Sequence, residues 1–380
     1  MSISYGVLGT YPPTQCGLAT FSNALIEALR SPDDLPSVVS IVDAPDDNAH
    51  RDVRHEWVRS HPGGAAAAAA ALNASDIAII QHEYGIYPGR DGVDVLDVAR
   101  ALQVPTLTVL HTVLTTPSPR QRIILEELAR HSAAVITMTQ TAKQRLIDLY
   151  AVDPSTIRVI PHGAPDNRTP QADRPAPTAA TGPVVLTWGL LGEGKGIEWA
   201  IEAMAQLTDL APRPQYQVVG QTHPRVLEQF GERYRDSLVR RAAELGVSDM
   251  VHFDARYLSK ADLNTLVQQA DIVLLPYDSR EQVTSGVLIE AITAGKPVVS
   301  TGFPHARELL ASGAGLVVER QDPVAIAAAL RRVLTEPGLS DRMAGEASRI
   351  APELLWPAVA DAYRQLAGEA LRPSKLLASA

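Results

Sequence analysis

The residues with the clearest chemical potential lie between Gln282 and Glu290. This stretch reads as a loop that carries Thr284, Ser285 and Gly286, followed by a short helix. A helix that opens on Ser and Gly presents unpaired N–H groups and the positive end of its dipole, which favours a phosphate. Glu290 falls on the same helical face as Gly286, about one turn deeper, where a carboxylate can accept two hydrogen bonds from a ribose diol. The spacing indicates a nucleotide-sugar site, and the alternative is a surface helix whose Glu faces water.

A glycine-rich segment, residues 189–196, is the second candidate. It holds four glycines with Lys195 among them, directly after an apolar run and before a helical pattern. Glycines let a diphosphate approach the backbone, and a lysine supplies a compact positive charge. Because Gly196 follows the lysine, the segment is not a P-loop, and it lacks a dinucleotide fingerprint. The alternative is a solvated lysine in a glycine-rich turn.

Two further candidates lie in the first half of the chain. Gly17 precedes a helix expected to begin near Thr20, so the backbone there can approach a ligand closely, although a tight turn explains the glycine equally well. His111 falls at the carboxyl end of an apolar strand, where an imidazole can bond sugar hydroxyls or serve a structural role. His82 and Glu83 end the preceding strand, but their spacing matches no metal motif.

Arg256 is the remaining cation placed just past a predicted strand. It suits a phosphate contact, because a guanidinium can grip a phosphate through two hydrogen bonds. A surface ion pair with Asp254 or Asp262 is at least as good an interpretation.

Composition narrows the class of protein. A length of 380 residues predicts two or three domains, and 46% hydrophobic content with 5% aromatics favours α/β layers. With 34 basic and 43 acidic residues the formal charge is −9 and no basic run occurs, which argues against nucleic acid as a partner. Cys16 is the only cysteine, so no disulfide forms within the chain. No leader and no apolar stretch of about 18 residues is present, so a soluble cytoplasmic protein is expected.

The elements needed to position these residues follow from alternating patterns. Apolar runs predict strands at 3–11, 37–44, 76–84, 105–113, 133–139 and 157–163, and again at 184–190, 216–221, 250–257, 272–278, 297–301 and 313–319. Helical patterns separate them. A Pro- and Thr-rich stretch at 165–183 reads as a linker. We therefore expect Rossmann-like βαβ domains at 1–164 and 184–350, with the site in the cleft between them and an amphipathic tail at 351–380.

Together these segments resemble the family-4 retaining glycosyltransferases of the GT-B fold, over essentially the whole chain. The resemblance rests on the loop at Gly17, the strand-end His111, the sequence at 160–163, the Lys195-Gly196 pair and the segment 288–301. A bacterial mannosyltransferase-like subgroup is most similar, through the sequences at 81–89, 111–114 and 282–286.

Two positions depart from the family pattern. The paired acidic motif of the family would place its first Glu at Gln282, and its second Glu maps onto Glu290. An amide keeps hydrogen bonding but loses charge. The family also commonly has Arg where this chain has Leu190, and Arg256 is our candidate replacement for that half of the diphosphate clamp.

The resemblance implies a retaining transferase that moves a hexose, mannose before glucose, from a GDP- or UDP-sugar to an acceptor hydroxyl. The acceptor can be a saccharide, a lipid-linked molecule or a small molecule, and contact with a membrane surface stays open. It implies two Rossmann-like domains facing a central cleft, in which domain 1–164 presents the acceptor and domain 184–350 binds the nucleotide sugar, with the tail at 351–380 crossing back to the first domain. No cofactor or metal is expected, because no Asp-x-Asp lies near a strand end.

The same resemblance distributes roles among the residues. The implied catalytic residues are His111, Lys195 and Gln282. The implied donor-binding residues are Gly17, Gly189, Lys195, Arg256, Gln282, Thr284, Ser285, Gly286, Val287 and Glu290. The alternatives are a sugar-nucleotide epimerase or a phosphorylase on the same fold, or a non-catalytic protein that binds a nucleotide sugar.

Overall fold

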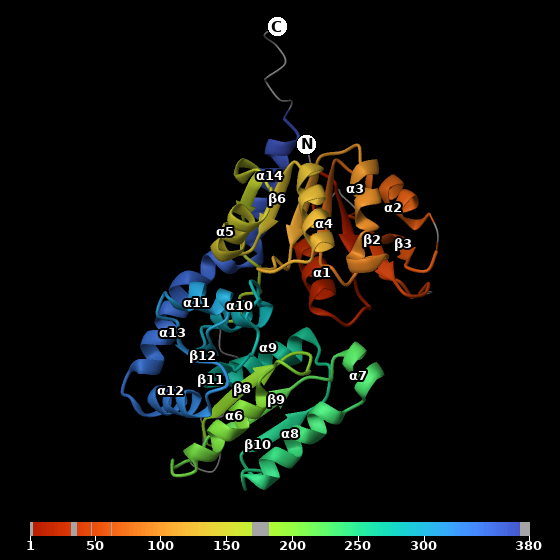
Figure 1. The fold of residues 1–380 in the computed structure, drawn as a ribbon. Coiled ribbons are helices and arrows are strands. Elements are labelled where there is room, and N and C mark those ends of the chain that lie inside the picture. Colours follow the sequence, from red (N-terminus) through yellow and green to blue (C-terminus); the bar gives the residue numbers. More distant parts are fainter. Residues whose placement is uncertain (1–2, 32–35, 47, 62, 169–181, 373–380) are drawn as a thin grey trace. The chain divides into compact units, whose positions relative to one another are not determined.

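The computed structural model consists of two compact units (Figure 1). It describes residues 3–31, 36–46, 48–61, 63–168 and 182–372. Unit 1 comprises Met1–Gly163 with Trp356–Ala380, and unit 2 comprises Ala164–Leu355. Most of the linker predicted at 165–183 lies outside the described residues.

Unit 1 is built on a seven-stranded sheet in which every strand pair is parallel. The spatial order is β3-β2-β1-β4-β5-β6-β7. The bounds are β1 Tyr5–Gly9, β2 Ser37–Val42, β3 Val53–Val58, β4 Ile77–His82, β5 Thr106–Leu110, β6 Ala134–Thr137 and β7 Ile157–Val159. The order reverses between β1 and β4, and in open parallel sheets such a reversal lies beside the ligand site.

Helices cover both faces of this sheet. They are α1 Gly17–Leu29, α2 Gly64–Leu72, α3 Val95–Ala101, α4 Pro119–Arg130, α5 Gln140–Leu149 and α14 Trp356–Ala370, with single 3₁₀ turns at Arg90–Gly92 and Pro154–Thr156. Alternate strand residues enter different cores, since Val7 packs with α1 and α14 while Leu8 packs with α2 and α3. This explains why the central strands are apolar on both faces.

One strand of this sheet was missed by the sequence analysis. Strand β3 pairs with β2 at the edge of the sheet, in a segment where we predicted no strand. Its sequence is VRHEWV, and the polar residues Arg54, His55 and Glu56 conceal the extended conformation. An edge strand has only one neighbour and a partly solvated face, so it needs no continuous apolar run.

Unit 2 contains a six-stranded parallel sheet in the order β10-β9-β8-β11-β12-β13. Its strands are β8 Val184–Trp188, β9 Gln215–Val219, β10 Val251–Asp254, β11 Ile272–Leu275, β12 Val298–Thr301 and β13 Gly315–Val318. Its helices are α6 Ile197–Met204, α7 Pro224–Phe230, α8 Arg233–Glu244, α9 Lys260–Gln269, α10 Gly286–Thr293, α11 Pro304–Leu310, α12 Pro323–Thr335 and α13 Leu339–Ile350, with 3₁₀ turns at Ala205–Leu207 and Ala351–Leu354. Both units therefore have the predicted α/β class with parallel sheets.

The C-terminal helix α14 packs within unit 1. Its buried residues Trp356, Val359 and Tyr363 share a core with residues of α1 and with the strands beneath. The indole of Trp356 lies edge-on to Phe21, with ring centroids 5.4 Å apart. A β-carbon added at Gly163 would overlap the Trp356 ring, so the backbone there approaches the indole closely. Helix α14 thus packs on the same core as strand β1.

No helix in the described part of the chain combines the length and the apolar character needed to cross a bilayer.

We expect the Trp356→Ala substitution to lower the free energy of unfolding of unit 1 by about 3–5 kcal/mol, because it removes a buried aromatic side chain and leaves a cavity. Urea denaturation followed by circular dichroism measures the loss. The matched control is Ile123→Ala on α4 of the same unit, where the side chain is 54% exposed and a change within about 0.5 kcal/mol is expected. Equal stability of the two variants would show that α14 contributes little to the core.

Candidate functional site

Helix α10 begins as predicted, with Ser285 as its N-cap. The Ser285 hydroxyl accepts a hydrogen bond from the Leu288 N–H at 3.3 Å, and the Ser285 N–H donates to His305 Nδ1 at 2.9 Å. Within the described residues the N–H groups of Gly286 and Val287 have no hydrogen-bond partner. The first turn therefore presents two free donors and the positive end of the helix dipole.

Glu290 lies one turn further along α10 and is half-buried. The indole of Trp188, the last residue of β8, donates to Glu290 Oε2 at 3.1 Å. Burial raises the pKa of the Glu290 carboxyl, while the Trp188 hydrogen bond and the charge of Lys260 oppose that rise. The indole fixes one carboxylate oxygen, so Oε1 is the oxygen available to another donor.

The glycine-rich segment before α6 is shaped by its glycines. Gly189, Gly194 and Gly196 all have positive φ, at 119°, 86° and 65°. A β-carbon at Gly196 would overlap the carbonyl oxygen of Pro276, so this position admits only glycine. A β-carbon at Gly189 would lie 3.8 Å from Val287 Cγ2. The start of this loop therefore lies against the first turn of α10.

Lys195 is held over an aromatic face. Its ammonium lies 4.4 Å from the ring centroid of Tyr277, and Tyr277 stacks on Phe303 at 5.5 Å. Burial lowers the pKa of Lys195 to about 8. The ring attracts the cation through its quadrupole. Lys195 is thus a fixed positive charge that is poorly solvated and suited to an anionic ligand.

The side chains of Gln282 and Thr284, in the loop before α10, are the next candidates. Gln282 is anchored through its backbone, since its N–H donates to Ser279 Oγ at 3.1 Å. The Thr284 hydroxyl is buried and has no hydrogen-bond partner among the described residues. Both side chains retain hydrogen-bonding capacity beside the N-terminus of α10.

Arg256 follows β10, as expected, but its guanidinium is occupied. Nε and Nη2 form a fork with the carboxylate of Asp254, with distances of 2.9 and 2.6 Å, and the side chain is 77% exposed. This pair holds the pKa of the Asp254 carboxyl below its usual value. The ion pair considered from sequence is therefore present, and a phosphate contact would require Arg256 to leave Asp254.

In unit 1, helix α1 starts earlier than expected. It begins at Gly17 rather than near Thr20, because Cys16 caps it through a thiol that accepts the Ala19 N–H at 3.4 Å. A β-carbon at Gly17 would meet nothing within 4 Å, and Gly17 has no positive φ. Packing within unit 1 therefore imposes no requirement for glycine at this position.

His111 lies directly after β5 and is held as a neutral ring. Its Nε2 contacts Gln81 Oε1 at 2.8 Å, and Phe21 lies edge-on at 5.0 Å. Burial, with His162 and His82 nearby, lowers the pKa of His111 to about 3. With Gln81 Oε1 as the acceptor, Nε2 carries the proton and Nδ1 is left as an acceptor.

The predicted residues thus divide between the two units. Unit 2 contains Lys195, Glu290, Arg256 and the 282–287 segment, and it brings the loop at Gly189 against α10. Gly17 and His111 belong to unit 1. Sequence reasoning missed the positioning partners Gln81, Trp188, Tyr277 and His305. Gln81, Trp188 and Tyr277 each lie at or just beyond the end of an apolar strand, and that position was the signal that could have identified them.

No group of three or more His, Cys, Asp or Glu side chains in the described residues is arranged to hold a metal ion.

Two family models match the chain in succession. Residues 19–168 match the model described as Glycosyltransferase Family 4, and residues 170–349 match the model described as Glycosyl transferases group 1. The two matches meet near the junction between the units. They confirm the family resemblance for both halves of the chain.

Similar proteins agree with these models. A D-inositol 3-phosphate glycosyltransferase of Frankia alni is 28% identical over 379 residues, covering 93% of this chain and 90% of that protein. A glycogen synthase of Mycobacterium tuberculosis is 28% identical over 242 residues, covering 63% of this chain, and the chain spans 55% of its length.

Solved structures support the fold. The Anabaena protein HepE in complex with UDP and glucose has a TM-score of 0.76 at 18% identity, covering 97% of this chain and all of that one. Sucrose-phosphate synthase of Thermosynechococcus elongatus has a TM-score of 0.74 at 20% identity, covering 96% of this chain and all of that one. The GT-B fold class predicted from sequence is confirmed.

We expect Lys195 to titrate near pH 8, because burial disfavours its charged form. Carbon-13 NMR of the lysine side chains measures the midpoint, and loss of the signal in Lys195→Arg assigns it. Since the unfolded chain keeps this proton up to pH 10.5, the free energy of unfolding should rise between pH 8 and 10.5 through this group. A midpoint at or above pH 10 would contradict the poorly solvated environment.

Proposed function

Because the chain belongs to the glycosyltransferases of the GT-B fold, we propose that it is a retaining hexosyltransferase using a nucleoside-diphosphate sugar. Mannose is the favoured hexose, through the subgroup resemblance, and glucose is the second choice. The observation that carries the proposal is the geometry at α10, where free N–H groups, the Lys195 loop and Glu290 occur together in unit 2. We further propose that the protein acts in the cytoplasm.

In this proposal the diphosphate is held by backbone N–H groups and by Lys195, with Arg256 as a second cation. The N–H groups of Gly286 and Val287 donate to phosphate oxygens, and Lys195 neutralises part of the negative charge. Gly189 lets the backbone approach the phosphates, and Thr284 and Ser285 shape the turn before α10. Gly17 is the proposed donor-binding residue of unit 1. No metal is needed, since the helix dipole and the ammonium stabilise the leaving group.

Glu290 is the proposed ribose ligand. Trp188 occupies Oε2, and the remaining oxygen can accept from a ribose hydroxyl. Gln282 and His111 are the proposed contacts to the transferred sugar. His111 is neutral well above pH 3, so it offers hydrogen bonds rather than charge.

The chemical step requires little from side chains as acid or base. The bond between the anomeric carbon and the diphosphate oxygen breaks, and the acceptor oxygen bonds the same carbon from the same face. The acceptor proton passes to the leaving phosphate oxygen. The chain positions both substrates and stabilises the charge that develops on the diphosphate.

Arg256 is the proposed second cation, in place of the arginine absent at Leu190. Because Arg256 forms a fork with Asp254, phosphate binding would exchange one anionic partner for another. Such an exchange keeps the guanidinium paired but forfeits the existing ion pair, which for an exposed pair is worth about 0–1 kcal/mol.

One observation favours a second candidate function. Gln282 stands where the family has an acidic residue, so a non-catalytic protein that binds a nucleotide sugar is the competing proposal. Turnover separates the two, because a binding protein would be stabilised by the donor without consuming it.

A panel of UDP- and GDP-sugars tests the proposed function directly. We expect one nucleotide sugar to raise the melting temperature by mass action and to release its nucleoside diphosphate when acceptors are supplied, in the presence of EDTA as well as without it. Stabilisation without turnover on any acceptor would favour the binding protein. Absence of stabilisation by every donor would reject both, and activity lost in EDTA and restored by Mg²⁺ would reject the metal-free step.

We expect Glu290→Gln to weaken the binding of the intact donor and of the free nucleoside diphosphate alike, because both carry the ribose. The loss should be about 1–3 kcal/mol for a charged hydrogen-bond acceptor. Isothermal titration of each ligand measures it. The control is Asp341→Asn, an exposed carboxylate on α13 of the same unit, which should bind as the wild type does. Unchanged affinity in Glu290→Gln would reject the ribose role.

A further inference from the structure

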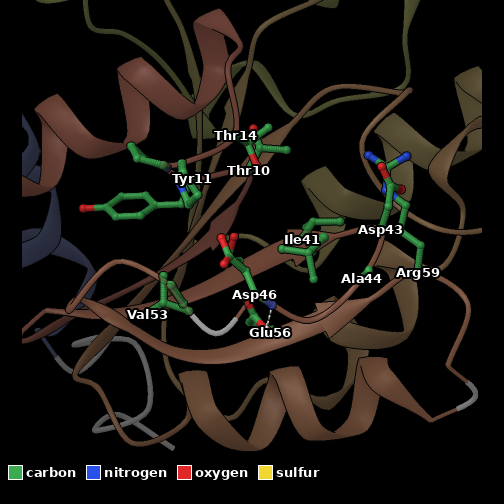
Figure 2. Close-up of a pocket in the computed structure, with 15 residues that line it drawn as sticks. Thr10, Tyr11, Thr14, Ile41, Asp43, Ala44, Asp46, Val53, Glu56 and Arg59 are labelled. Carbon is green, nitrogen blue, oxygen red and sulfur yellow. Dashed lines mark hydrogen bonds and ion pairs between the residues drawn. The ribbon is translucent and has the colours of Figure 1, made fainter. Parts of the chain in front are cut away.

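A cavity of about 260 Å³ opens on unit 1 (Figure 2). Its walls are the loop that follows β1, the carboxyl end of β2, residues between β2 and β3, and Val53 and Glu56 of β3. Figure 2 shows Thr10 and Thr14 on one side and Asp46 and Glu56 on the other. Its volume is below the roughly 300–1,000 Å³ of sites for drug-sized ligands, which suits a single sugar ring.

Ser40 of β2 gives the cavity an unused polar group. The side chain is only 3% exposed and lines the cavity, and its hydroxyl has no hydrogen-bond partner among the described residues. Its neighbours Val39 and Ile41 point into the core with α2 and α3, so Ser40 faces the opposite side of the sheet. Because the Ser40 hydroxyl lines the cavity, it can donate to or accept from a ligand hydroxyl.

The lining is rich in hydrogen-bond acceptors and carries excess negative charge. It contains three carboxylates, Asp43, Asp46 and Glu56, against one guanidinium, Arg59, for a formal charge of −2. Arg59 Nε lies 3.3 Å from Asp43 Oδ1, so the cation is already paired. A phosphate in this cavity would have to take Arg59 from Asp43, as proposed for Arg256 and Asp254, and would in addition face the carboxylates of Asp46 and Glu56.

The two remaining carboxylates are held in place but not saturated. Glu56 Oε2 accepts the Asp46 N–H at 3.1 Å, and Asp46 Oδ1 accepts the Asn48 N–H at 2.9 Å. Among the described residues, one oxygen of each carboxylate has no hydrogen-bond partner and can accept from an ammonium or from sugar hydroxyls. Backbone hydrogen bonds fix the direction of both groups.

We propose that this cavity binds the acceptor, and that it selects a neutral or amino-bearing sugar ring over a phosphorylated one. The acceptor role rests on the proposed transferase function, in which we take domain 1–164, the body of unit 1, to present the acceptor. The charge preference rests only on the lining. Like charges between the carboxylates and a phosphate disfavour the anionic ring, and an ammonium gains charge-assisted hydrogen bonds.

The test compares three probes that share one ring: glucosamine, glucose and glucose 6-phosphate. Ligand-observed NMR with the full chain and no donor gives each Kd. In the wild type we expect glucosamine to bind at least tenfold more tightly than glucose 6-phosphate, with glucose between them. Asp46→Asn and Glu56→Gln should each reduce the ratio of the glucose 6-phosphate Kd to the glucosamine Kd. Glu56→Lys should bring this Kd ratio below one.

Matched controls separate this cavity from general charge and from folding. Asp97→Asn removes a carboxylate that is 67% exposed on α3 of the same unit and should leave the ratio unchanged. Melting temperatures verify that each variant is folded. The proposal is overturned if none of the probes binds, if glucose 6-phosphate binds as tightly as glucosamine, or if Glu56→Lys keeps the wild-type ratio.

Donor binding distinguishes a failure of the cavity from a failure of the transferase proposal. If nucleotide sugars stabilise the chain but glucosamine binds no more tightly than glucose 6-phosphate, the cavity proposal fails and the transferase proposal stands. If glucosamine binds more tightly than glucose 6-phosphate but no donor stabilises the chain, the transferase proposal fails and a sugar-binding cavity remains.

Discussion

The polarity of the parallel sheets is the constraint on which every proposed site depends. In a parallel sheet all strands bring their carboxyl ends to one edge, and the helices that follow begin there with unpaired N–H groups. Lys195, Arg256 and the 282–287 segment all follow strands of unit 2, and Gly17 and His111 follow strands of unit 1. The acidic cavity obeys the same rule, since it lies after β1 and β2. Residues that are distant in sequence become neighbours because each follows a parallel strand and therefore lies at the same edge of the sheet.

Much of this arrangement could be predicted, because apolar periodicity and glycine placement are local properties. Ser285 and Gly286 marked the start of α10, and the glycines around Lys195 have the positive φ that such a loop needs. Strand β3 could not be recognised, because an edge strand with a charged face lacks the apolar run that identifies its neighbours. The start of α1 was placed late because a cysteine is an unusual N-cap.

The positioning partners could not be predicted, because they are tertiary contacts. Trp188 is 102 residues from Glu290, and Gln81 is 30 residues from His111. No pattern in either segment encodes the pairing, which exists only once strand order is set. Arg256 illustrates the opposite case, since its partner Asp254 is two residues away and the ion pair was foreseeable from sequence.

The electrostatics of the candidate site in unit 2 depend on Lys195, a poorly solvated cation just before helix α6. Lys195 rests on the Tyr277 ring, which attracts the ammonium without neutralising it, and burial lowers the Lys195 pKa to about 8. A diphosphate beside the ammonium would favour the charged form and raise that pKa. Binding of such a ligand above pH 8 would therefore take up a proton. An amide at Gln282, rather than a carboxylate, adds no negative charge to unit 2. The substitution that departs from the family is thus physically compatible with a site in which Lys195 is a poorly solvated cation.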